Sequence, residues 1–294
     1  MALAPRLGRV FVWVYPAQVS GLAWWPVAVV VVLLVALNVI NNRVAPNSHY
    51  LLWTFGGSVA LLAIGLLDGN SFTDMGLGVH YFVRGAIWAG VSIGLITAVY
   101  LVGSMFRRTR EAFHNEDMGR LSPGKLLFQA LIEVPFGTVV LEEIAFRSVL
   151  FAMLVRRYGL VWGLVIGALL FGLWHILPSM GTHEANPALG KMVGTGLRGN
   201  ILAVALSVLT TAGAGILFSV LRVVSGSVLA PMGFHWATNG LGYAFSWILI
   251  RERNRRRAVH RRRVRQRRAE ESVAAGQTSG QPADVRHDTR GGGE

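Results

Sequence analysis

Residues 21–40 read GLAWWPVAVVVVLLVALNVI and contain no charged side chain. A helix needs about 20 predominantly apolar residues to cross the roughly 30 Å hydrocarbon core of a bilayer, and this stretch has that length. The whole chain of 294 residues follows the same tendency, since 53% of its residues are hydrophobic and only 15% are charged. Ordinary soluble domains carry about 25% charged residues. The sequence therefore predicts a membrane protein.

Further apolar runs of similar length recur along the chain. Together with the first run they fall at about 20–40, 50–67, 84–105, 134–155, 160–177, 200–222 and 228–250. We therefore predict an all-α polytopic transmembrane helix bundle with seven or eight spans. The expected organisation is N-terminal transmembrane helices over residues 1–105, a cytoplasmic loop over 106–125, a second helix bundle over 126–250 and a tail over 251–294.

The C-terminal tail is strongly basic at its start. Residues 251–268 read RERNRRRAVHRRRVRQRR, and the whole tail holds 13 arginines against 6 acidic residues, a net charge of +7 out of +13 for the chain. Positive charge beside a span marks the cytoplasmic side and attracts anionic lipid, so we expect membrane lipid rather than nucleic acid as its partner. Residues 269–294 are rich in Gly, Ser, Gln and acids, and we expect them to be disordered.

These features predict a multi-pass membrane protein with a cytoplasmic C-terminus, and we expect its location to be a bacterial plasma membrane. Arg107 and Arg108, which follow the third run, fall on the same side as the tail. The chain has no cysteine, which excludes disulfides, thiolate metal sites and a cysteine nucleophile. Any metal would need His and carboxylate ligands.

Ionisable and amide side chains inside the apolar runs are the candidates for function. A charge near the bilayer centre costs a few kcal/mol or more, and such residues normally face the bundle interior with a partner. The side chains that qualify are Glu142, Glu143, Arg147, His175, His235 and Asn239.

Helical spacing sorts these residues into groups. Glu143 and Arg147 are four residues apart, so they lie on one face in the favourable order for an ion pair. Glu142 lies about 100° around the helix and is a spare carboxylate. His235 and Asn239 are again four residues apart. One Glu with one or two His can activate water, hold a metal ion or relay protons, and buried hydrogen bonds between helices are the structural alternative.

At these residues the sequence resembles the CPBP family of intramembrane proteases, the CaaX-processing and bacteriocin-processing family also called type II CaaX prenyl endopeptidases. That family has three motifs: Glu-Glu-x-x-x-Arg, Phe-x-x-x-His and His-x-x-x-Asn. Here they read EEIAFR at 142–147, FGLWH at 171–175 and HWATN at 235–239. The resemblance covers about residues 125–245, and Ser148 stands where many members carry Gly.

The resemblance implies an intramembrane endopeptidase that hydrolyses peptide bonds of membrane-associated proteins or peptides, with residues 126–250 as its catalytic bundle. Glu142 and His175 would activate the attacking water, and His235 with Asn239 would stabilise the oxyanion. Glu143 and Arg147 would be the supporting ion pair. Two forms remain open, a metalloprotease with zinc or another divalent metal on the glutamate and both histidines, and a metal-free glutamate protease.

Helix geometry places one condition on this site. With straight helices, Glu142 would lie ~12 Å and His175 ~3–5 Å from one membrane face, and His235 ~10 Å from the other, a spread on the order of 15 Å. Tilt, or a broken helix near Pro135 or Pro231, would have to bring them together. A proton-coupled transporter and a non-catalytic membrane immunity or scaffold protein of the same fold are the alternative functions.

Overall fold

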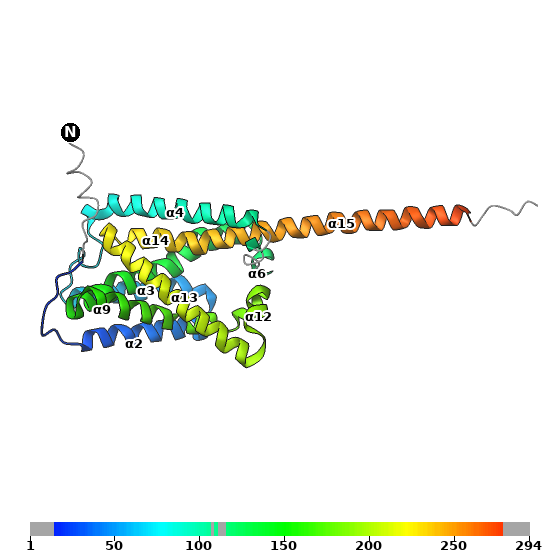
Figure 1. Ribbon diagram of the computed structural model, residues 1–294. Helices are drawn as coiled ribbons and strands as arrows, with labels where there is room; N and C mark the ends of the chain where they lie inside the picture. The colour runs from blue at the N-terminus through cyan, green and yellow to red at the C-terminus, as the bar shows by residue number, and fades with distance from the viewer. Residues whose placement is uncertain (1–14, 107–108, 111–115, 279–294) are drawn as a thin grey trace, which may run out of the picture. The chain divides into compact units, whose positions relative to one another are not determined.

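The computed structural model describes residues 15–106, 109–110 and 116–278. Within these residues all regular structure is helical, which confirms the all-α fold (Figure 1). The longer helices are α2 (Trp25–Val39), α3 (Tyr50–Leu67), α4 (Phe82–Met105), α9 (Leu150–Trp174), α13 (Gly196–Ser225), α14 (Leu229–Trp236) and α15 (Gly242–Thr278). The shorter ones are α6 (Glu116–Gly119), α7 (Pro123–Phe128), α8 (Val140–Glu143), α10 (Ile176–Ser179), α11 (Thr182–Ala185) and α12 (Pro187–Val193). Arg107 and Arg108 lie outside the described residues.

Several of these helices are extended by tighter or wider turns. Wider π-helical turns form η1 (Ile40–Val44), η4 (Gln129–Val139), η5 (Ile144–Val149) and η6 (Ala237–Leu241), and 3₁₀ turns form η2 (Asn47–His49) and η3 (Val79–Tyr81). The chain divides into two compact units, residues 1–250 and 251–294. The first unit contains all the predicted apolar runs.

In the described part of the chain, five helical stretches are long and apolar enough to cross a membrane. They are Trp25–Val44, Tyr50–Leu67, Val79–Met105, Pro123–Trp174 and Gly196–Ser225. The number is lower than seven for two reasons. The stretch Pro123–Trp174 contains two predicted runs, and the last run, 228–250, is helical but is interrupted by the polar residues of the third motif. The molecule is thus a polytopic membrane protein.

Buried arginines hold together one end of the first unit, which we call the Asp68 end. Arg157 binds both carboxylate oxygens of Asp68, at 2.6 and 2.8 Å, and donates to the carbonyl of Ala23 at 2.7 Å. Arg222, which is fully buried, donates to the carbonyl of Asp74 at 2.9 Å. The start of α2, the end of α3, the middle of α9 and the end of α13 therefore meet at this end.

The opposite end, which we call the Trp247 end, is held by different contacts. The indole of Trp247 donates to the carbonyl of Leu121 at 3.0 Å. The guanidinium of Arg43 lies 3.0 Å from the sulfur of Met180. Successive predicted runs therefore connect one end to the other and back, as in an up-and-down bundle.

A sharp reversal at Gly159 folds the longest stretch into a hairpin. Gly159 has φ +81° and ψ 171°, a conformation that a residue without Cβ adopts readily. A Cβ at Gly163 would lie 2.5 Å from the side chain of Val155, and the rings of Phe146 and Phe171 are 5.2 Å apart. Residues equally distant from Gly159 on either side are therefore neighbours, and α9 consists of two antiparallel segments.

The loop between α3 and α4 dips into the bundle from the Asp68 end. Met75 is fully buried, and its sulfur would lie 2.8 Å from a Cβ at Gly65, where the side chain of Val149 is also close. The carbonyl of Gly76 accepts a hydrogen bond of 3.0 Å from the backbone N–H of Val228. The segment that leads into α14 thus begins inside the bundle, at the level of Val149, rather than at its outer face.

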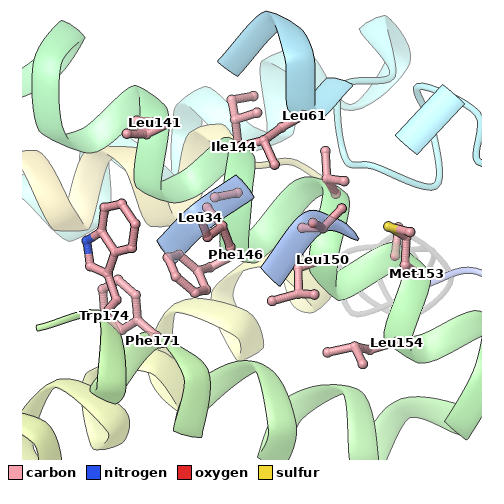
Figure 2. Packing of buried hydrophobic residues seen from close by; sticks show 14 of the residues in the cluster. Leu34, Leu61, Leu141, Ile144, Phe146, Leu150, Met153, Leu154, Phe171 and Trp174 are labelled. Carbon is pink, nitrogen blue, oxygen red and sulfur yellow. The ribbon is translucent and has the colours of Figure 1, made fainter. Parts of the chain in front are cut away.

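The core of the first unit lies around the hairpin and the N-terminal helices (Figure 2). Its buried side chains include Leu34, Leu61, Leu141, Ile144, Phe146, Leu150, Met153, Leu154, Phe171 and Trp174. Large apolar side chains are also exposed on the outside of the bundle, for example Val32 (68%), Leu67 (88%) and Val83 (69%). An apolar surface of this kind is what a bilayer covers.

The tail differs from the expectation of disorder. The helix α15 continues through the arginine-rich residues and ends at Thr278, so the segment 269–278 is helical. Arginine, alanine and glutamate are strong helix formers, and AEESVAA continues the helix without a breaker. Residues 279–294 lie outside the described part of the chain.

Candidate active site

The glutamate pair lies on α8, a short helix flanked by π-helical turns on both sides. Pro135 in η4 has no backbone N–H, and its own carbonyl accepts from Val140, five residues on. The η5 turn follows immediately after Glu143. Glu142 is 7% exposed and Glu143 is fully buried. Wider turns of this type are frequent at functional sites, because they reorient the side chains that follow them.

The two carboxylate oxygens of Glu142 have different surroundings. Its Oε1 accepts a hydrogen bond of 3.0 Å from the indole N–H of Trp174. Its Oε2 is buried and has no hydrogen-bond partner among the described residues. The Nε2 atom of His175 lies 3.9 Å from Oε2, and the Nε2 atom of His235 lies 3.7 Å from it. One carboxylate oxygen therefore faces two imidazole nitrogens from two other helical segments.

The depth of these residues explains how they meet. Glu142 lies 17 residues before Gly159 and His175 lies 16 residues after it, so the hairpin places both at one level. Glu142 is seven residues from Val149, about 10 Å along the helix. The segment that leads into α14 begins at the level of Val149. His235 lies about 9–10 Å along the helix from that point. The expected spread of about 15 Å is removed by the hairpin and by the inserted loop.

Hydrogen bonds on the far side of each imidazole fix the tautomers. The Nδ1 atom of His175 is 2.8 Å from the carbonyl oxygen of Phe171, and a carbonyl can only accept. The Nδ1 atom of His235 is 2.8 Å from Oε1 of Glu143. Both histidines therefore carry a proton on Nδ1 and turn Nε2 toward Glu142.

Glu143 also contacts Arg147, as their four-residue spacing predicts. The Nη1 atom of Arg147 lies 3.4 Å from Oε1 of Glu143, and both side chains are fully buried. The guanidinium carbon lies 3.8 Å from the centre of the Phe171 ring and 4.8 Å from that of Phe218. Stacking on aromatic faces stabilises a buried cation. A continuous chain of contacts thus runs from Arg147 through Glu143 to His235.

Asn239 does not join this cluster. Its side chain is partly buried and makes no hydrogen bond to Glu142, His175 or His235 among the described residues. It lies in η6, where a π-helical turn replaces the α-helical continuation from His235 and alters the orientation of the residues that follow.

Two hollows lie near the cluster, and the first of them is lined by one of its residues. A cavity of about 350 Å³ has His175 in its wall and is otherwise lined by neutral residues of α10, α11, α12 and α13, among them Ser179, Thr182, Ser207 and Thr210. A second, almost entirely apolar hollow of about 490 Å³ lies between α4, α14 and the η4–α8 segment. Figure 1 shows α4 and α14 running side by side. The cavity at His175 is thus a largely apolar approach to the cluster with a few hydroxyl groups in its wall, and the second hollow is almost entirely apolar.

The cluster does not fit a metal ion as it is arranged. Two ligand atoms about 2.0 Å from a tetrahedral zinc ion lie about 3.3 Å apart. The distances from Oε2 of Glu142 to the imidazole nitrogens, 3.7 and 3.9 Å, are longer. Across residues 15–106, 109–110 and 116–278, no group of three or more His, Cys, Asp or Glu could hold a metal ion. The metalloprotease form of the prediction is therefore not supported.

Two contributors to the cluster were not predicted from the sequence. Trp174 is the donor to Glu142, and Phe218 of α13 forms part of the aromatic surroundings of Arg147. Trp174 directly precedes His175 in the second motif, and that adjacency was a usable signal. Phe218 lies in a uniformly apolar run, where nothing in the sequence distinguishes it from its neighbours.

Comparison with known proteins agrees with the location of the three motifs. Residues 124–241 match the model of a family described as type II CAAX prenyl endopeptidase Rce1-like. Searches of curated proteins and of solved structures gave no match. The matched residues contain all three motifs, whereas α2, α3 and α4 lie outside the match. The match of residues 124–241 to the Rce1-like type II CAAX prenyl endopeptidase model therefore supports a CPBP family intramembrane protease.

Proposed function

We propose that the protein hydrolyses peptide bonds of membrane-associated proteins or peptides, using water activated by Glu142. One observation carries this proposal: a buried carboxylate oxygen of Glu142, without a hydrogen-bond partner in the described residues, faces the Nε2 atoms of His175 and His235. Carboxylate and imidazole at such a site supply the base, the acid and the donor that peptide hydrolysis needs. The family match supports a protease.

The charges of the cluster favour a protonated His235. Two ionised glutamates and one guanidinium would leave a net negative charge in a buried site, which is unfavourable. A proton on one imidazole makes the cluster neutral. His235 is the better candidate, because its Nδ1–H donates to the carboxylate of Glu143, whereas that of His175 donates to an uncharged carbonyl. The chain Arg147–Glu143–His235 would hold that imidazolium in place.

In the proposed reaction, Oε2 of Glu142 removes a proton from water while the water oxygen attacks the substrate carbonyl carbon. The Nε2 atom of His175 accepts the second water proton in a hydrogen bond and orients the water. The carbonyl oxygen becomes an oxyanion, which accepts a hydrogen bond from Nε2–H of His235. When the carbon–nitrogen bond breaks, the proton held by Glu142 moves to the leaving nitrogen, and the products are a carboxylic acid and an amine.

Asn239 remains a proposed second donor to the oxyanion. The support for that role is its position in the third motif, because among the described residues its side chain makes no hydrogen bond to Glu142, His175 or His235. No step of the proposed reaction involves a metal.

The cavity beside His175 supports a route for the substrate. Its walls carry hydroxyl groups and apolar surface but no charged residue, which suits an uncharged stretch of extended peptide. We propose that the substrate chain enters through this cavity and presents its carbonyl to the space between the two imidazoles.

Cleavage of a peptide library by the purified full-length protein tests the proposal. We expect cleavage by the wild type, none above background for Glu142→Gln or His235→Ala, and no effect of a chelator. Glu133→Gln removes a carboxylate from the same helical segment outside the cluster and should cleave like the wild type. Full activity of Glu142→Gln would overturn the proposal, and complete inhibition by the chelator would replace it with a metal mechanism.

A further inference from the structure

The indole N–H of Trp174 is the one described donor to the carboxylate of Glu142. The hydrogen bond to Oε1 is 3.0 Å long, and Trp174 is 8% exposed. Figure 2 shows its ring beside Phe171 at the edge of the core. The ring packs edge to face on Phe146, with centroids 5.8 Å apart. The donor is therefore held in place by packing as well as by the bond itself.

This contact makes the two oxygens of Glu142 unequal. A carboxylate side chain can rotate about its last bond, which would exchange Oε1 and Oε2. A hydrogen bond from a neutral donor to one oxygen, inside a buried site, fixes the plane of the carboxylate. With Oε1 held by the indole, Oε2 is the oxygen that faces His175 and His235.

The backbone of Trp174 is in turn anchored by the N-terminal part of the chain. The side-chain amide of Asn38 in α2, 8% exposed, donates to the carbonyl of Trp174 at 2.8 Å. The amide of Asn42 donates to the side-chain oxygen of Asn38 at 2.7 Å. The contact falls at the C-terminal end of α9, where the helix leaves carbonyls without intrahelical partners. A helix outside the family match thus fixes the position from which Trp174 reaches Glu142.

We propose that Trp174 is a positioning residue for the reaction: its indole N–H orients Glu142 so that Oε2 is presented to the water between the two imidazoles, with Asn38 anchoring the Trp174 backbone. This inference rests on the proposed function. Trp174 touches Glu142 and acts only through it.

Kinetics of Trp174→Phe test this role, because phenylalanine keeps an aromatic ring and removes the N–H. We expect kcat to fall about tenfold, with KM changed less than about twofold, since a charge-assisted hydrogen bond is lost and the substrate cavity is untouched. Trp247→Phe is the matched control, because it also loses an indole bond to the protein, at Leu121, and should match the wild type in both measurements.

A second readout does not depend on activity. In the ¹⁵N-labelled full chain, the indole N–H signal of Trp174, assigned by its loss in Trp174→Phe, should shift when Glu142→Gln replaces a charged acceptor by a neutral one. The signal of Trp247 should stay unchanged. An unshifted Trp174 signal overturns the proposal, and so does a Trp174→Phe enzyme with wild-type kcat. If Glu142→Gln shifts the Trp174 signal but the wild-type protein cleaves no peptide, the contact is supported and the peptidase assignment is rejected instead.

Discussion

Replacing Arg147 by methionine tests the chain of contacts behind His235. The substitution keeps an unbranched side chain of similar length and removes the charge. The attraction between Arg147 and Glu143 at 3.4 Å is about 5 kcal/mol at an effective dielectric of 20, and the stacking on phenylalanine rings adds about 2 kcal/mol. Against this, Nε and Nη2 of Arg147 have no hydrogen-bond partner in the described residues, and removing each relieves about 1–3 kcal/mol.

The balance is a loss of about 3 kcal/mol in the free energy of unfolding, at the lower end of what breaking a buried ion pair costs. For a chain of this size, 1 kcal/mol corresponds to about 2–4 °C, so the midpoint should fall by about 6–12 °C. Thermal unfolding in detergent micelles, followed by tryptophan fluorescence at one fixed scan rate, measures it. Arg261→Met in the exposed tail is the control and should leave the midpoint unchanged.

The double variant Glu143→Gln with Arg147→Met separates this explanation from a simple packing defect. Removing both charges leaves no buried carboxylate without its partner, so at least half of the lost stability should return. If Arg147→Met unfolds at the wild-type temperature, or if the effects of the two substitutions simply add, the pair is not coupled and its proposed support of His235 is refuted.

Three further predictions concern other parts of the molecule. Gly76→Ala should destabilise the protein by at least about 1–2 kcal/mol, because Gly76 has φ +75° and a Cβ there would lie 2.0 Å from Nε of Arg222. Gly94→Ala is the control and should be tolerated, because no atom lies within 4 Å of a Cβ at Gly94. Equal melting midpoints of the two variants would contradict this prediction. Ser207→Trp should fill much of the cavity beside His175 and raise KM at least about fivefold with kcat retained, and an unchanged KM would exclude the cavity as the substrate route. Of two reporters fused after the arginine-rich tail, one that is active in the cytoplasm should give a signal and one that becomes active only after export should not. Activity of the export-dependent reporter would reverse the proposed orientation.

The sequence predicted the helix bundle for a definite physical reason. Long apolar runs and helical spacing are local properties, so the all-α fold and the Glu143–Arg147 contact could both be read from residue positions. The depth of His235 could not, because it depends on how far the loop containing Met75 enters the bundle. That loop has the composition of an ordinary connection, and its burial is decided by packing against Gly65 and Val149, which are remote in sequence.

The polar environment of the site was less predictable than its residues. Trp174 could have been taken for one more aromatic residue near a helix end, and only the hairpin at Gly159 brings it to Glu142. The π-helical turn at η6, which leaves Asn239 without a contact to the cluster, follows from main-chain packing, whereas the motif's spacing assumes a regular α-helix. Regular periodicity therefore placed the candidate residues on helical faces, and departures from that periodicity determined how their side chains are oriented.

The turn at Gly159 also bears on how the protein enters its membrane. The reversal takes one glycine, and of the two arginines that precede it Arg157 is buried against Asp68, so only a very short connection separates the segment bearing Glu142 from that bearing His175. We therefore expect the translocation machinery to release the two segments together as a preassembled pair, so that the glutamate leaves the aqueous channel already opposite its aromatic and imidazole neighbours. A carboxylate that would be costly on a solitary inserting helix is thereby shielded from acyl chains during biogenesis.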